Sequence, residues 1–92
     1  MSKIIYLDYQ ATTPVSKKTL DKMLPFFSEN FANPHSNNHK LGRMANDAVE
    51  QSREHIADLI FANKTEIIFT SGATESNNLA IKSIARNYFE KN

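Results

Sequence analysis

The chain has 92 residues, of which 11 are Lys or Arg and 10 are Asp or Glu; it has no Cys, and its formal net charge is +1. The basic residues are scattered singly among acids, which argues against a nucleic-acid-binding face or a membrane-surface helix, and no apolar run approaches the roughly 18–20 residues of a membrane span. The absence of Cys excludes disulfides, thiolate metal sites and a cysteine nucleophile. From the length and the lack of a membrane span, we expect one domain at most, located in the cytoplasm.

The first elements expected are a strand and a helix. Ile4–Leu7 is short, apolar and rich in β-favouring residues, which predicts a strand or an extended arm. Ser16 is a good N-cap for a helix that continues to about Leu24, because apolar residues recur there at helical spacing. Pro25 is expected to end or kink that helix.

The middle of the chain predicts an irregular loop followed by a long helix. Asn33–His39 is polar and rich in turn-forming residues, so no regular structure is expected there. From Leu41 to Ile60 the apolar positions keep the helical period and charged residues fill the opposite face, which predicts a helix of about 20 residues. Asn63 is a candidate for a left-handed residue that ends this helix.

The last third of the chain predicts a strand, a turn and a helix. Glu66–Thr70 has the composition of a short buried strand, and Ser71–Thr74 that of a tight turn. Apolar residues recur at helical spacing from Ile81 to Tyr88. The whole order of strand, helix, helix, strand and helix indicates the α/β class.

The turn before this last helix carries the clearest chemical signal. The first N–H groups of a helix lack partners within the helix and the helix dipole is positive there, so an anion is favoured at this end. Gly72 allows close approach of the backbone, and Ser71 and Thr74 add hydroxyl donors. The pattern predicts a phosphate site, although a turn in which these hydroxyls cap their own helix accounts for the same spacing.

Two other polar clusters give weaker signals. Asp8 stands at the end of the first predicted strand and could line a site, but an Asp at a strand end followed by polar residues usually marks a turn, and a turn is the favoured interpretation. His35 and His39 lie four residues apart in a loop with no third ligand nearby, so no metal site is expected.

Three blocks of residues, in this order, resemble the N-terminal portion of cysteine desulfurases of the NifS/IscS type. They belong to the class V, fold-type I group of enzymes that depend on pyridoxal 5'-phosphate. The blocks are Ile5–Pro14, Asn33–His39 with Gly42 after it, and Phe69–Ala80. The resemblance covers nearly all of the chain. One departure is Ala32, where the family usually has Gly before Asn-Pro, so Ala must adopt the backbone shape of that turn.

The resemblance implies roles for particular residues. Ala73, through its backbone, and Thr74, through backbone and hydroxyl, match the positions that hold the cofactor phosphate. Ala11, Thr12 and Asn33 match loops that approach the mouth of the active site. The implied fold is the N-terminal part of a fold-type I large domain, in which helices wrap a mostly parallel sheet. Residues 1–92 are therefore expected to be a truncated N-terminal segment of such a domain.

The family's chemistry also requires groups that no motif in this chain matches. These groups are a lysine that bonds to the cofactor, a histidine and an aspartate at its ring, and a mobile cysteine that takes the sulfur. No catalytic residue is assigned here, and we expect no desulfurase activity from these 92 residues alone. Two alternatives are a fragment that binds the missing remainder or a full-length desulfurase subunit, and a residual module that binds phosphorylated ligands.

Overall fold

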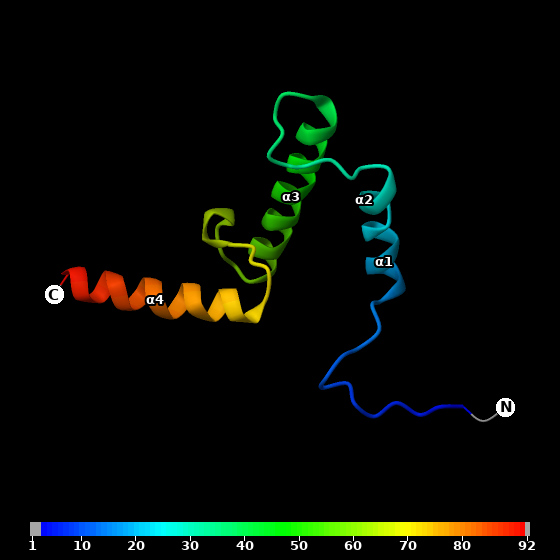
Figure 1. Cartoon of the computed structure of the whole chain (residues 1–92), viewed down its shortest axis with the longest axis horizontal. Helices are drawn as coiled ribbons and strands as arrows, with labels where there is room; N and C mark the ends of the chain where they lie inside the picture. The colour runs from blue at the N-terminus through cyan, green and yellow to red at the C-terminus, as the bar shows by residue number, and fades with distance from the viewer. Residues whose placement is uncertain (1–2, 92) are drawn as a thin grey trace. The chain divides into compact units, whose positions relative to one another are not determined.

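The computed structural model describes residues 3–91 and contains four α-helices and one short 3-10 helix over that range (Figure 1). The chain divides into two compact units, Met1–Gln51 and Ser52–Asn92, and the boundary between them falls within the longest helix. No helix in the described range is both long enough and apolar enough to cross a membrane. The helices are α1 (Lys17–Met23), α2 (Pro25–Ser28), α3 (Lys40–Leu59), η1 (Lys64–Glu66) and α4 (Ala73–Lys91).

In the first unit, residues 3–8 have no assigned secondary structure, a turn follows at residues 9–11, and the short helix α1 is the first regular element. The prediction for α1 is confirmed, because the Ser16 hydroxyl accepts a hydrogen bond from the Thr19 N–H at 3.2 Å. The helix ends at Met23, and Pro25 starts α2 at a position where its missing N–H costs nothing. Pro25 therefore separates the two helices, as its backbone chemistry predicts.

The long helix α3 agrees with its predicted span within one residue at each end, but its termination differs from the prediction. Phe61, not Asn63, takes the left-handed backbone conformation, with φ of 58°. The Ala62 N–H bonds to the Ala57 carbonyl at 2.9 Å and the Phe61 N–H to the Asp58 carbonyl at 3.4 Å. This is a Schellman motif with Phe where Gly is usual.

Asn63 instead starts η1. Its φ of −83° is extended, and its N–H donates to the Glu66 carboxylate at 2.7 Å. The prediction of a left-handed Asn63 was wrong because the left-handed residue in this motif is fixed by the hydrogen bonds that end the helix, two residues earlier.

The two predicted strands are not formed in residues 3–91. Ile4–Leu7 has no assigned secondary structure, and Glu66 belongs to η1 instead of to a strand. Ile67 has strand-like angles, φ of −98° and ψ of 124°, but no β-ladder partner is present in the described range. A strand requires a hydrogen-bonded neighbour, so local β-propensity by itself does not produce one.

Little of the chain is buried. Among the described residues with side chains placed, only Gly42, Ala45 and Ala57 are buried, and all three lie on α3. Large apolar side chains on α4 are mostly in solvent, as Ile84 with an exposed fraction of 70% illustrates. Each unit therefore presents apolar surface that the described residues do not cover.

Candidate functional site

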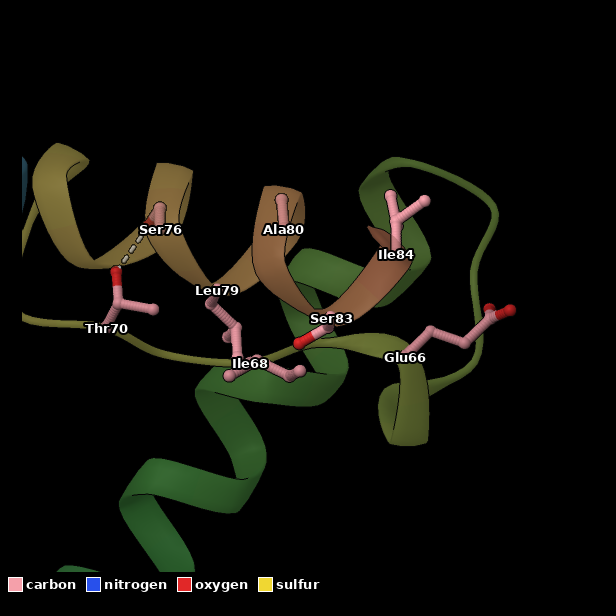
Figure 2. A pocket seen from close by; sticks show the side chains of 8 residues that line it. All are labelled: Glu66, Ile68, Thr70, Ser76, Leu79, Ala80, Ser83 and Ile84. Carbon is pink, nitrogen blue, oxygen red and sulfur yellow. Dashed lines mark hydrogen bonds between the residues drawn. The ribbon is translucent and has the colours of Figure 1, made fainter. Parts of the chain in front are cut away.

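The turn between residues 70 and 75 is held by hydrogen bonds on both sides of Gly72. The Thr70 hydroxyl donates to the Gly72 carbonyl at 3.2 Å and also lies 2.5 Å from the Ser76 hydroxyl (Figure 2). The Ser71 hydroxyl and N–H both donate to one Glu75 carboxylate oxygen, at 2.6 and 3.2 Å. These contacts fix the backbone of the turn with respect to the first turn of α4.

This geometry lowers the pKa of Glu75. The hydrogen bond from the Ser71 hydroxyl, and after it the one from the Ser71 N–H, lower the pKa of the Glu75 carboxyl. An ionised carboxylate in the first turn is also favoured by the helix dipole. The two hydrogen bonds from Ser71 hold the negatively charged Glu75 carboxylate close to Ser71, at the start of the turn.

The start of α4 leaves backbone donors available. Among the described residues, no acceptor pairs with the N–H of Ala73 or Thr74, because these are the first two positions of the helix. The first hydrogen bond that closes the helix runs from the Ser76 N–H to the Gly72 carbonyl at 3.1 Å. A Cβ atom built at Gly72 would meet nothing within 4 Å, so the space beside the turn is open.

These features fit a phosphate group. Two N–H donors, one hydroxyl and the positive end of a 19-residue helix lie at one place. Asn78, in the second turn of α4, donates through its amide to the Thr74 carbonyl at 2.9 Å. Of the predicted site residues, Ala73 and Thr74 form the first two positions of α4, and their role in phosphate binding stays a prediction.

The other predicted residues lie in the first unit. The N–H groups of Ala11 and Thr12 approach the Asp8 carbonyl at 3.0 and 3.5 Å, which forms a turn. The Asn33 side-chain oxygen accepts from the His35 N–H at 2.9 Å. Among the described residues, no hydrogen bond joins Asn33 to Ala11 or Thr12, so their lining role stays a prediction.

His39 has a structural role that the sequence did not indicate. It precedes α3, and its Nδ1 accepts a hydrogen bond from the Gly42 N–H at 3.0 Å, so the ring caps the helix. Gly42 is required there because a Cβ atom would lie 1.8 Å from the Ser36 carbonyl oxygen. The sequence does not indicate this cap, because His is not among the usual N-cap residues.

Ala32 adopts the turn without a left-handed backbone, because Phe61 is the sole non-glycine residue with positive φ among those described. The replacement of Gly by Ala therefore brings no strain of that kind. Residues 3–91 contain no group of three or more His, Cys, Asp or Glu side chains placed to hold a metal ion.

A separate groove of about 380 Å³ lies between the segment before the turn and α4 (Figure 2). Its walls are mainly apolar, with Ile68 on one side and Leu79 and Ile84 on the other. Neither Ala73 nor Thr74 lines it. The groove is therefore distinct from the candidate phosphate site at Ala73 and Thr74.

Comparison with known proteins places the chain in a family. Residues 5–92 match the model of the class-V aminotransferases. The chain is 58% identical over 87 residues to "Cysteine desulfurase IscS" of Rickettsia massiliae, covering 95% of this chain and 21% of that protein. It is 56% identical over 87 residues to "Probable cysteine desulfurase, mitochondrial" of Dictyostelium discoideum, covering 95% of this chain and 19% of that protein.

The fold agrees with these relationships. A solved structure titled "NIFS-LIKE PROTEIN" superposes with a TM-score of 0.85 and 38% sequence identity, over 94% of this chain and 23% of the other. The chain thus spans about one fifth of the length of the curated relatives it matches. The resemblance to NifS/IscS-type proteins is confirmed, and the chain belongs to the class-V aminotransferase family.

Proposed function

We propose that this chain supplies the phosphate-binding turn of a cysteine desulfurase-like protein that uses pyridoxal 5'-phosphate. The observation that carries the proposal is the pair of unpartnered N–H groups at Ala73 and Thr74, on a turn fixed by Ser71 and Glu75. The relationship to proteins named as cysteine desulfurases supports the choice of cofactor and of a sulfur-mobilising activity for the whole protein.

The chain's own residues would bind and orient the phosphate end of the cofactor. The Ala73 and Thr74 N–H groups and the Thr74 hydroxyl would donate to phosphate oxygens, and the dipole of α4 would favour the negative charge. The cofactor, when bound, supplies an electron sink for reactions at amino-acid carbons. The step that carries sulfur needs a cysteine, which these 92 residues do not contain.

Amide NMR of the 92-residue chain tests the proposed phosphate site. Inorganic phosphate should shift the Ala73 and Thr74 amide resonances, and Thr74→Val should weaken phosphate binding by about tenfold, because a hydrogen bond to a charged group is lost. Thr65→Val, in η1, is the matched control and should leave binding unchanged. Unshifted Ala73 and Thr74 amides at millimolar phosphate would rule out the site.

Pyridoxal phosphate needs a second control because it also reacts with exposed lysine amines. Unphosphorylated pyridoxal reacts with the same amines but lacks the phosphate. If the chain binds pyridoxal phosphate more tightly than pyridoxal, and if Thr74→Val abolishes this preference, the proposed phosphate site is supported. Equal binding of both compounds contradicts it.

We further propose that the rest of a desulfurase, either the remainder of the chain or a full-length subunit, covers the exposed apolar surface. Ile68 and Ile84, with exposed fractions of 67% and 70%, are examples of that surface. In such a complex a neighbouring strand would pair with residues 67–70, which already have extended geometry at Ile67, and this would restore the α/β fold expected from the sequence. Size-exclusion chromatography of the mixture should show a complex, and no shift would contradict this proposal.

The cytoplasmic location expected from the sequence is part of the same proposal. The described residues contain no helix able to span a membrane, and the name of one relative places that relative in mitochondria. Fractionation of cells expressing a tagged chain would distinguish the two compartments.

A further inference from the structure

A single arginine on α3 contacts the segment that leads into the candidate phosphate site. The Arg53 Nη1 donates to the Ile67 carbonyl oxygen at 2.5 Å, across 14 residues of sequence. The Arg53 Cζ also lies 4.8 Å from the centroid of the Phe69 ring, which is a cation–π geometry. Arg53 and Ile67 are both half-buried, so solvent competes less for this hydrogen bond than at a fully exposed site.

These two contacts hold the segment at points two residues apart. Ile67 has extended angles, and the contact there is to its backbone carbonyl, whereas the contact at Phe69 is to the side-chain ring. No β-ladder pairs with this segment among the described residues. The two contacts with Arg53 therefore fix the position of the segment and its rotation about the chain axis, as pairing with a neighbouring strand would.

The fixed segment is joined directly to the phosphate-binding turn. Thr70 follows Phe69 and its hydroxyl reaches Gly72 and Ser76, while Ser71 is bonded to Glu75. Only Thr70, Ser71 and Gly72 separate Phe69 from Ala73, the first residue of α4. A shift of the segment at Ile67 or Phe69 is therefore passed to the N–H groups of Ala73 and Thr74.

We propose that Arg53 is a positioning residue for phosphate binding: it anchors residues 67–69 to α3 and so sets where the N-terminus of α4 presents its donors. This inference rests on the proposed function. Arg53 would act through the backbone of the segment and not by contacting the phosphate. Its planar guanidinium serves both contacts at once, which the ammonium of a lysine cannot do in the same way.

The test compares Arg53→Gln with Arg86→Gln in the 92-residue chain. Both variants remove one positive charge, but Arg86 lies on α4 and its side chain makes no hydrogen bond or ion pair with the described residues. Arg53→Gln should shift the amide resonances of residues 67–74, leave those of α1 in place, and weaken the binding of inorganic phosphate by about tenfold or more. Arg86→Gln should change phosphate affinity by less than about twofold.

Arg53→Lys adds a readout that separates positioning from charge. It keeps a charged donor for the Ile67 carbonyl but lacks the guanidinium that serves this carbonyl and the Phe69 ring at once, so an affinity between those of the wild type and Arg53→Gln is expected. Equal weakening by Arg53→Gln and Arg86→Gln would overturn the proposal, because it would show that only net charge matters. Unchanged phosphate affinity in Arg53→Gln would overturn it as well.

Two further outcomes are separable. If the wild-type chain binds no phosphate, the proposed function fails, while the amide shifts of residues 67–74 still decide whether Arg53 anchors the segment. If Arg53→Gln loses the helical circular dichroism of the chain, Phe69→Leu takes its place, because it removes the ring and leaves the hydrogen bond. That variant should weaken phosphate binding by about two- to fivefold, and an affinity equal to wild type would count against the anchor.

Discussion

Replacement of Gly42 by Ala offers the sharpest test of the first unit, because local propensity and tertiary structure predict opposite signs. Ala is favoured over Gly inside a helix by about 1 kcal/mol, and Gly42 lies in the first turn of α3. Propensity alone therefore predicts that Gly42→Ala stabilises the chain. The contacts of Gly42 with the preceding loop predict the reverse.

The magnitude follows from the distance between the added atom and the loop. An alanine Cβ would lie 1.8 Å from the Ser36 carbonyl oxygen, whereas ordinary contact begins at 3.4 Å, so the backbone must open by about 1.6 Å. Overpacking of this kind costs about 1–3 kcal/mol. The same movement breaks the bond from the Gly42 N–H to His39, and loss of a cap costs about 0.5–2 kcal/mol. After the propensity gain, we expect a net destabilisation of about 0.5–4 kcal/mol.

Thermal unfolding followed by circular dichroism measures the effect, with a fall in Tm of at least about 2 °C expected for a chain of this size. Gly72→Ala is the matched control, since its Cβ would meet nothing within 4 Å, and we expect it to cost less than about 1 kcal/mol. Hydrogen exchange adds a local readout, because the Gly42 N–H is protected by His39. A Gly42→Ala chain as stable as the wild type would refute the reasoning.

Three other predictions concern single side chains. His39→Ala should destabilise α3 by about 0.5–2 kcal/mol, and His39→Asn should recover most of that loss in urea unfolding, because Asn is a good N-cap. Phe61→Gly should raise Tm by relieving a left-handed backbone that costs roughly 1 kcal/mol, since the Phe61 side chain is 98% exposed; a lower Tm would show that the ring has a partner. Glu75 stabilises the folded turn at pH above the pKa of the unfolded chain, because Ser71 lowers its pKa in the folded state, and this contribution is lost as the pH falls through that lowered pKa. Glu75→Gln should abolish this pH dependence, and an NMR titration showing an unshifted carboxyl would contradict it.

Features that depend on neighbouring residues could be predicted from the sequence alone. The Ser16 cap, the break at Pro25 and the span of α3 follow from side-chain chemistry and spacing within one helix, and the structure confirms each. The motif around Gly72 likewise indicated the family, because the residues that shape that turn lie next to one another in sequence.

Tertiary structure decided the features that need a partner from elsewhere in the chain. A strand over residues 67–70 requires a neighbouring strand, and none is present in the described range, so strong β-propensity there gave only an extended segment. Gly42 is needed because Ser36 folds back against α3, and Arg53 meets Ile67 across 14 residues. Composition and periodicity do not encode such contacts, because they describe a residue's neighbours along the chain and not its neighbours in space.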